Sequence, residues 1–212
     1  MTEPTSTYGP DVVLDEPAFI HPTALIHGKV RIGKGASVWP YTVMRAENFE
    51  IEIGEHVNIQ DFTLIHVGHS CGTHVGAHSS VAHRATLHGC KIGENCLIGV
   101  GATLMDGSEI GACSVVGAGA LVKEGTKVPP SSIVVGTPAK VIKSRNSWVA
   151  NRFNAWLYSI NAEAYAKGDH RRWDGPGFWE EAKAKMTELH EEFERLKAAD
   201  DPAARDPEAV EV

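Results

Sequence analysis

The chain has 212 residues, of which 42% are hydrophobic, and its formal net charge is −7 at pH 7. This length suffices for one sizeable core with appendages. The acidic balance, which no basic patch interrupts, argues against a nucleic-acid partner. No apolar run approaches the ~20 residues of a membrane span, and no apolar segment follows a basic start as in a secretory signal peptide. We therefore expect a cytoplasmic protein without membrane association.

Residues 1–18 carry Pro, Asp and Glu with little periodicity, and we interpret them as an N-terminal arm. From residue 19 to residue 144 aliphatic residues recur every six positions, usually followed by glycine or another small residue. The series runs through Ile20, Ile26, Ile32, Val38, Met44, Ile53, Ile59, Ile65, Val75, Val81, Leu87, Ile92, Ile98, Leu104, Ile110, Val116, Val122 and Val128. A six-residue period is typical of a β-helix of hexapeptide turns, whereas an α-helix would repeat its apolar face every three or four residues.

Two insertions interrupt the six-residue period. Ile53 follows Met44 by nine positions, and Val75 follows Ile65 by ten. We expect both insertions to be loops that leave an otherwise regular prism, and such loops often carry function.

The pattern changes to a helical one in residues 145–198. Apolar residues in 147–166 recur at mixed three- and four-residue intervals, which suits an amphipathic helix, and a second helix is predicted from about Phe178 to Ala198. We expect both helices to pack along the prism and to cover an edge or a subunit joint. Residues 199–212 are acidic, contain proline and lack large apolar side chains, so we expect them to be disordered.

Three histidines, His66, His83 and His88, lie at positions that the repeat sets. The blocks around them, and one near the end of the repeat region, are similar to ordered blocks of the γ-class carbonic anhydrase family. These blocks are Arg45-Ala46-Glu47, Asn58-Ile59-Gln60-Asp61, Ile65-His66, the His83 turn, Leu87-His88-Gly89-Cys90 and Gly136-Thr137-Pro138-Ala139-Lys140-Val141. The resemblance covers roughly residues 19–144.

The resemblance implies a fold, an assembly and an activity. The fold is an all-β left-handed parallel β-helix, here with C-terminal α-helices. The assembly is a homotrimer with intersubunit metal sites, each taking His66 and His88 from one subunit and His83 from its neighbour. The metal is Zn2+ (or Fe2+ or Co2+), and the reaction is the reversible hydration of carbon dioxide to bicarbonate.

The phase of the repeat agrees with this ligand set. In the resembled fold three hexapeptide turns make one triangular coil, so every third aliphatic residue lies on the same side. Arg45, His66 and His88 then form an outward column, with His66 and His88 about one strand spacing, ~4.8 Å, apart. His83 belongs to the side of Ile59, which is turned away. The three histidines therefore cannot meet within one chain, but two chains packed side by side can bring them together.

Four further residues complete the implied site. In the resembled family the residue matching Gln60 orients the attacking hydroxide, and Gln60 and Asp61 would both reach the site from the neighbouring subunit. Arg45 either contacts the substrate or forms an intersubunit salt bridge with Glu47 and Asp61, and these roles are compatible. Three imidazoles leave one position on the metal open for water, whose pKa a divalent ion lowers to near 7. The hydroxide that forms would attack carbon dioxide.

The sequence also departs from the active members of that family. Asn48 stands where they have an acidic residue, and their glutamate-bearing acidic loop is absent. His69 or His74 could shuttle protons instead, and without a shuttle the hydration would be slow. In family members an Asn or Tyr from the C-terminal region reaches the site. Asn161 and Tyr165 are the candidates here, with simple packing as the alternative for Tyr165.

Three other functions are compatible with the same repeat. A hexapeptide acyltransferase would use one histidine as a general base and would bind coenzyme A. A thioesterase or another metal hydrolase would direct the same hydroxide at an ester carbonyl. A non-catalytic trimeric assembly subunit would need His66, His83 and His88 only for the stability of the trimer.

Overall fold

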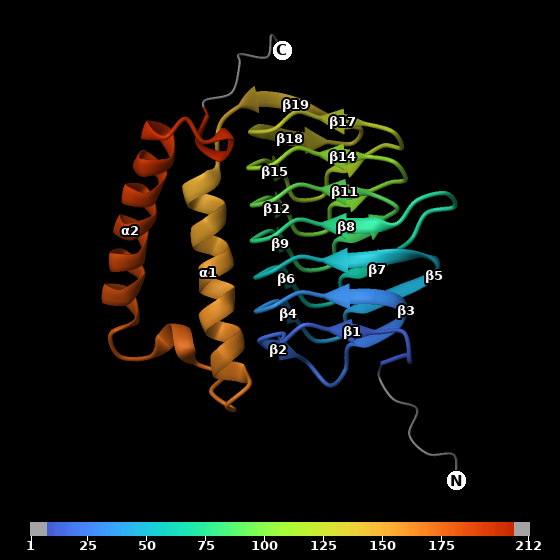
Figure 1. Cartoon of the computed structure of the whole chain (residues 1–212), viewed down its shortest axis with the longest axis horizontal. Helices are drawn as coiled ribbons and strands as arrows, with labels where there is room; N and C mark the ends of the chain where they lie inside the picture. The colour runs from blue at the N-terminus through green and yellow to red at the C-terminus, as the bar shows by residue number, and fades with distance from the viewer. Residues whose placement is uncertain (1–7, 206–212) are drawn as a thin grey trace.

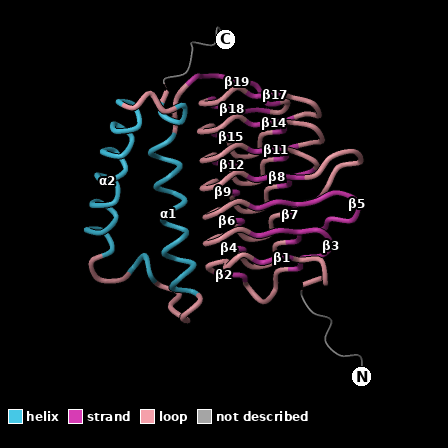
Figure 2. Tube along the Cα trace, viewed as in Figure 1, coloured by secondary structure: helices cyan, strands magenta, loops and turns pink. Residues whose placement is uncertain are grey.

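The computed structural model describes residues 8–205, which form a three-sided prism of short strands with two long helices along one side (Figure 1, Figure 2). The chain winds round the prism, so each strand pairs with its counterpart in the coils before and after it. This pairing is parallel throughout the prism except at the final strand pair. The predicted parallel β-helix with C-terminal α-helices is therefore confirmed.

The three faces of the prism are defined here by their strands. Face 1 contains β7 (Leu64–His66), β10 (Thr86–His88), β13 (Thr103–Leu104) and β16 (Leu121–Val122). Face 2 contains β1 (Val13–Leu14), β8 (Thr73–Val75), β11 (Lys91–Ile92), β14 (Glu109–Ile110) and β17 (Lys127–Val128). Face 3 contains β2 (Phe19–Ile20), β4 (Ser37–Val38), β6 (Asn58–Ile59), β9 (Ser80–Val81), β12 (Leu97–Ile98), β15 (Val115–Val116), β18 (Ser132–Gly136) and β19 (Ala139–Ser144). Two long strands, β3 (Leu25–Ile32) and β5 (Val43–Ile53), run from face 1 into face 2.

The core is the column of aliphatic side chains that the hexapeptide period predicts. On face 1 the register pairs Met44 with Ile65, Ile65 with Leu87 and Leu87 with Leu104. All four side chains have no solvent exposure. Burial of this kind stabilises the fold by about 1.5–3 kcal/mol for each large aliphatic side chain.

The first insertion does not form the expected loop. The chain between Met44 and Ile53 stays in β5, and it pairs with β3 with a register shift between Gly28 and Val30. Gly28 has φ +82° and lies so close to β5 that a Cβ atom there would be 1.7 Å from the carbonyl oxygen of Ala46. A bulge beside a glycine thus absorbs the extra residues, and the long strands project past the corner of the prism (Figure 1).

Helix α1 (Trp148–Tyr165) packs along face 3, against β2, β4, β6 and β9. Its side chain Asn151 fixes it to the prism, because the amide donates to the carbonyl oxygens of Asn95 (2.8 Å) and Ser114 (3.1 Å). In return the Asn95 amide donates to the carbonyl oxygen of Trp148 at 3.0 Å. Helix α2 (Phe178–Ala198) follows a short 3-10 helix, η1 (Arg172–Asp174), and lies outside α1 (Figure 1).

The segment predicted to be disordered is ordered as far as Arg205. It contains the 3-10 helix η2 (Pro202–Ala204), which packs on α2, and Ala204 is buried. The amide of Asn146 donates to the carbonyl oxygens of Ala203 and Arg205. Hydrogen bonds from a side chain distant in sequence to their backbone carbonyl groups, which composition does not reveal, hold these residues in place. Residues 206–212 of the predicted tail and residues 1–7 of the predicted arm lie outside the described part of the chain.

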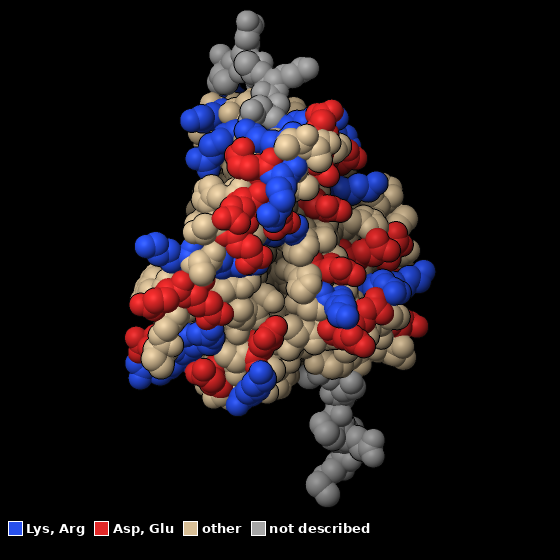
Figure 3. Space-filling view, turned by 60° about the vertical axis from the view of Figure 1, so that its left-hand side comes forward, with Lys and Arg blue, Asp and Glu red and all other residues tan. Residues whose placement is uncertain are grey.

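The outer surface of the helices carries both signs of charge. Where Figure 3 brings the helical side forward, Lys and Arg side chains alternate with Asp and Glu side chains without a contiguous basic area among the residues drawn in colour. Within residues 8–205, neither helix is long and apolar enough to cross a membrane.

Candidate metal centre

His66 and His88 occupy neighbouring rungs at the end of face 1. His66 is the last residue of β7 and His88 the last of β10, and the register pairs them directly. Arg45 pairs with His66 one coil below, and His27 pairs with Arg45 below that. The outward column derived from the repeat phase is therefore confirmed.

Each of these two imidazoles has a carboxylate on its outer side. His66 Nε2 lies 3.0 Å from Glu47 Oε2, and His88 Nδ1 is in contact with Asp106 Oδ1. The inner nitrogens, His66 Nδ1 and His88 Nε2, face each other at 3.1 Å. The four side chains thus form a ladder, which we call the Glu47–His66–His88–Asp106 column.

The positions of the protons in this column decide whether the two inner nitrogens repel each other. A neutral imidazole carries one N–H, and a carboxylate can only accept a hydrogen bond. If each outer nitrogen donates to its carboxylate, then the inner nitrogens of His66 and His88 direct two lone pairs at each other. Such an arrangement is relieved by a cation between them. Two nitrogens bound at 2.0–2.1 Å to one tetrahedral zinc ion lie about 3.3 Å apart, close to the observed spacing, so these residues fit a divalent metal.

The carboxylates of the column are held in their charged form. Desolvation acts to raise the pKa of Glu47, but its hydrogen bond with His66 and the charge of Arg45 offset this, and the pKa lies below its ordinary value. Desolvation also acts to raise the pKa of Asp106. The hydrogen bonds from His88 and from the backbone N–H of His69 lower it by more, so the pKa of Asp106 lies below its ordinary value. A carboxylate on the outer nitrogen is the usual partner of a metal-binding histidine.

Asp106 is a site residue that the sequence analysis missed. It lies 18 residues after His88, which is the length of one regular coil. This interval is the feature of the sequence from which Asp106 could have been predicted as a neighbour of His88. The phase gives the strand position of a residue, however, and Asp106 reaches His88 from the turn beyond β13.

His83 lies in the turn between β9 and β10 and is directed toward a different part of the molecule. Its Nδ1 lies 2.9 Å from Asp61 Oδ2 in the coil below. Its Nε2 lies 3.5 Å from the hydroxyl of Tyr158, which belongs to helix α1 on face 3. His83 therefore precedes β10 while His88 ends it. Within residues 8–205 of one chain, no group of three or more His, Cys, Asp or Glu side chains is arranged to hold a metal ion.

The α1 residue beside His83 is Tyr158. It is neither Asn161 nor Tyr165, the two candidates from the sequence. Burial, together with the charge of Asp61, raises the pKa of Tyr158 to about 12, so its hydroxyl keeps its proton at neutral pH. Tyr165 instead packs edge-on against Trp39, with ring centroids 4.9 Å apart, and Asn161 is buried in the helix. The packing alternative for Tyr165 is the correct one.

Gln60 and Arg45, the two remaining predicted site residues, already have partners within the chain. The buried amide of Gln60 donates to Asn58 Oδ1 at 2.9 Å. Arg45 forms an ion pair with Glu47 and is half exposed. The Arg45 guanidinium therefore extends the column at its lower end, where it is partly in contact with solvent.

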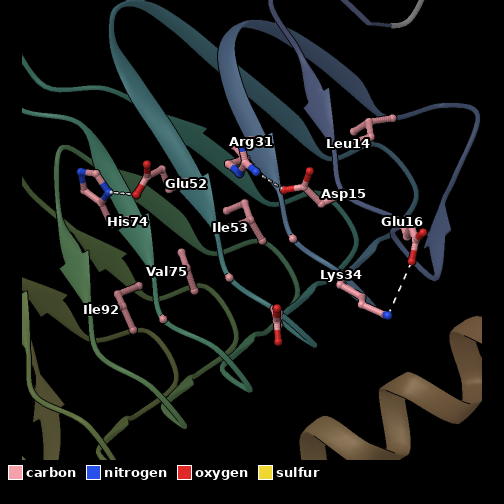
Figure 4. Close-up of a pocket in the computed structure, with 14 residues that line it drawn as sticks. Leu14, Asp15, Glu16, Arg31, Lys34, Glu52, Ile53, His74, Val75 and Ile92 are labelled. Atoms are coloured by element: carbon pink, nitrogen blue, oxygen red, sulfur yellow. Dashed lines mark hydrogen bonds and ion pairs between the residues drawn. The ribbon is translucent and has the colours of Figure 1, made fainter.

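The two candidate proton shuttles are separated by the fold. His74 lies on face 2, where its Nδ1 is 3.0 Å from Glu52 Oε2, and it lines a depression of about 870 Å3 (Figure 4). Two further ion pairs line this depression, Arg31 with Asp15 at 2.7 Å and Lys34 with Glu16 at 3.6 Å. His69 by contrast donates its backbone N–H to Asp106 Oδ2 at 3.3 Å, so only His69 lies beside the column.

Comparisons with known proteins relate this chain to hexapeptide-repeat proteins and to carbonic anhydrases. A family profile described as "Bacterial transferase hexapeptide (six repeats)" matches residues 89–124. "Gamma carbonic anhydrase 2, mitochondrial" of Arabidopsis thaliana is 38% identical over 137 residues, which are 62% of this chain and 49% of that protein. The chain thus spans about half the length of that relative. "Probable carbonic anhydrase" of Methanocaldococcus jannaschii is 49% identical over 120 residues, which are 57% of this chain and 76% of that protein.

A solved structure extends the likeness to the fold. The Bacillus cereus protein, named as a candidate acetyltransferase, matches with a TM-score of 0.73 and 32% sequence identity, over 76% of this chain and 96% of that one. The similar proteins therefore bear the names of two enzyme classes.

Proposed function

This chain belongs to the hexapeptide-repeat family of the γ-class carbonic anhydrases, and we propose that it is a metal-dependent enzyme that interconverts carbon dioxide and bicarbonate. The observation that carries the proposal is the Glu47–His66–His88–Asp106 column, in which two imidazoles, each with a carboxylate at its outer nitrogen, turn their inner nitrogens toward each other at 3.1 Å. Zinc is the metal we propose, with Fe2+ and Co2+ as the alternatives, because histidine nitrogens suit all three.

The third ligand in this proposal is His83 of a neighbouring copy. A contact between the His83 turn of one chain and the His66 strand of the next joins two different surfaces, and such a heterologous contact closes into a ring when the rotation permits. Exposed apolar side chains lie between these two elements, beside the exposed Arg84 of the His83 turn. Tyr41 and Phe62 stack at 5.1 Å with 56% and 59% of their surface in solvent, and Leu64 on β7 is 41% exposed. A patch of this kind favours burial against another copy, in keeping with a homotrimer.

The residues of the chain have separate tasks at this site. When bound by three imidazoles, a divalent ion lowers the pKa of a coordinated water to near 7. Asp61 accepts the Nδ1 proton of His83 and so leaves Nε2 without a proton, as an acceptor that faces the Tyr158 hydroxyl. The hydroxyl of Tyr158, protonated at neutral pH, lies on that Nε2 side and can donate a hydrogen bond into the site. In this proposal Gln60 serves the neighbouring chain's site as a hydrogen-bonding group, and Arg45 with Glu47 closes the lower end.

Proton release is the step for which the chain is poorly equipped. The acidic loop of active family members is absent, and Asn48 replaces an acidic residue. His69 is the histidine nearest to the column by its backbone contact with Asp106. We therefore propose slow hydration in which proton transfer to solvent limits turnover, and an added small buffer such as imidazole should increase the rate.

One observation favours a second function, that of an acyltransferase: the likeness to the Bacillus cereus protein named as a candidate acetyltransferase. An acyltransferase needs one histidine as a general base. It would have no use for three histidines that each contact a carboxylate, as His66, His83 and His88 do. A metal-dependent thioesterase would use the same ligands, so it is separated from the proposal by substrate alone.

The decisive experiment measures metal content and two activities on the same purified protein. We expect about one zinc-type ion per chain by elemental analysis, and carbon dioxide hydration by stopped flow that exceeds hydrolysis of a thioester panel. His66→Ala, His83→Ala and His88→Ala should each lose both metal and activity. The control His190→Ala, which changes an exposed histidine of α2, should lose neither. A metal-free protein with full acyl-transfer activity would refute the proposal.

A further inference from the structure

The upper end of the column contains an aspartate for which the comparisons and the family resemblance give no role. We propose that Asp106 is a positioning residue that holds the His88 imidazole in the tautomer protonated at Nδ1 and so presents Nε2 to the metal. This inference rests on the metal site proposed above, and it assigns a task to a residue outside the set of ligands.

Asp106 is held by two segments that are distant in sequence. Its Oδ1 contacts Nδ1 of His88, which precedes it by 18 residues. Its Oδ2 accepts the backbone N–H of His69, which precedes it by 37 residues, at 3.3 Å. Asp-Gly is also a common turn sequence, and Gly107 has φ +67°. A turn residue, however, needs no contact with either His88 or His69, so the two contacts indicate a role beyond the turn.

The insertion between β7 and β8 is shaped around this carboxylate. A Cβ atom on Gly68 would lie 2.6 Å from Asp106 Oδ2 and 2.9 Å from the Cys71 sulfur. Only glycine leaves room there for the carboxylate to reach both partners. The additional residues of the second insertion thus hold Asp106 beside His88, which is a physical reason for their presence in an otherwise regular coil.

The contact decides which nitrogen of His88 is free. A neutral imidazole has one N–H, and the hydrogen bond that the ring makes selects the nitrogen that bears it. A carboxylate at Nδ1 selects Nδ1–H, because it can only accept. Nε2 then points at Nδ1 of His66, 3.1 Å away. Without Asp106 the ring could place its proton on Nε2, and that nitrogen could not bind a metal until the proton moved.

Two variants test the proposal by different routes. Asp106→Asn keeps the shape but introduces an amide, which can donate to Nδ1 and favour the other tautomer. Gly68→Ala keeps the carboxylate but displaces it. The control Glu109→Gln removes a carboxylate of β14 that pairs with Lys127 on face 2. Lys127 also donates to the carbonyl oxygen of Gly107, so this control perturbs the Asp106–Gly107 turn but keeps the Asp106 side chain. Each of the three variants changes only one small group, and we expect urea denaturation to show that all three remain folded.

Two readouts other than activity are measured. In metal-free protein at about pH 8, above the ordinary pKa of histidine, nitrogen NMR should find His88 protonated at Nδ1 in the wild type and shifted toward Nε2 in Asp106→Asn. The zinc affinity, measured by competition with a chromogenic chelator, should fall by about 10–100-fold in both Asp106→Asn and Gly68→Ala. Glu109→Gln should match the wild type in both readouts.

The outcomes separate this inference from the function on which it rests. An unchanged His88 tautomer together with zinc affinity within about twofold of wild type in Asp106→Asn would overturn the role of Asp106. A wild-type protein that binds no zinc would overturn the proposed metal site, and the NMR measurement on metal-free protein would still decide whether Asp106 sets the tautomer. Loss of zinc affinity in Glu109→Gln as well would also count against Asp106, because the effect would then be one of general charge.

Discussion

Mixing two inactive variants should restore part of the metal site. His83→Ala removes the histidine that contacts Asp61 and the α1 side of the prism, whereas His88→Ala removes one from the end of face 1. Each variant alone should bind no metal. If His83 acts on the neighbouring chain, then a mixed trimer contains an interface at which one chain supplies His66 and His88 and the next supplies His83.

The expected size of the recovery follows from the arrangement of the ligands. Each complete site needs a chain intact at His66 and His88 beside a neighbour intact at His83. In equal, random mixtures each condition is met about half of the time, so about a quarter of the sites should be complete. A trimer that contains both variants should have about one complete site in three.

The assay is refolding of the two variants together, followed by zinc analysis and stopped-flow hydration, with mixed trimers identified by native mass spectrometry. The matched control mixes His66→Ala with His88→Ala. These two histidines pair on adjacent rungs of the same chain, so every chain in that mixture lacks one of them and no site should return. Confirmed mixed trimers without recovery in the first mixture, or equal recovery in the control, would refute the intersubunit site.

Replacing Asn151 with alanine should lower the free energy of unfolding by about 2–4 kcal/mol, because its buried amide bonds two carbonyl groups of the prism; urea denaturation measures this, and a loss below about 0.5 kcal/mol would contradict the docking role. Burial, with the charge of Arg152, lowers the pKa of His78 from 6.5 to about 4. The folded state therefore favours the neutral ring, and stability that is complete above pH 6.5 should be lost as the pH falls from 6.5 toward 4. His78→Asn, which tolerates the positive φ of this position, should flatten that part of the stability profile, and an unchanged profile would exclude His78 as its source. Truncation after Ala198 removes the buried Ala204 and should lower the thermal midpoint by about 2–8 °C. This corresponds to a loss of about 1–2 kcal/mol, since each kcal/mol shifts the midpoint by about 2–4 °C in a chain of this size. An unchanged midpoint in calorimetry would mean that η2 contributes nothing to stability.

The coil, and the positions of the histidines on it, can be predicted from the spacing of residues alone. In a parallel β-helix each residue sits above its counterpart one coil earlier, so a count of hexapeptides gives both the face and the level of a side chain. That count placed His66 beside His88 and above Arg45, and it placed His83 with Ile59 and Asp61. The two helices were also predictable, because their apolar periodicity differs from that of the coil.

The groups that surround those histidines could not be predicted in this way, because they depend on how turns and helices pack. The repeat fixes strand positions, but Asp106 acts from a turn, and its reach depends on the space that Gly68 leaves in an insertion with no period. Tyr158 contacts His83 because α1 packs on face 3 in one particular rotation about its axis. The helical pattern by itself would allow several other residues of α1 to occupy that place.

The same reason explains the two corrections to the fold. Nothing in the composition of residues 199–205 indicates that Asn146 will bond their carbonyl groups. The spacing between Met44 and Ile53 shows that residues have been inserted, but whether they leave the prism or stay in it depends on the approach of Gly28 to the Ala46 carbonyl. Local periodicity thus determined the scaffold, whereas contacts between segments distant in sequence decided which groups surround the site, because those contacts depend on how turns and helices pack in three dimensions.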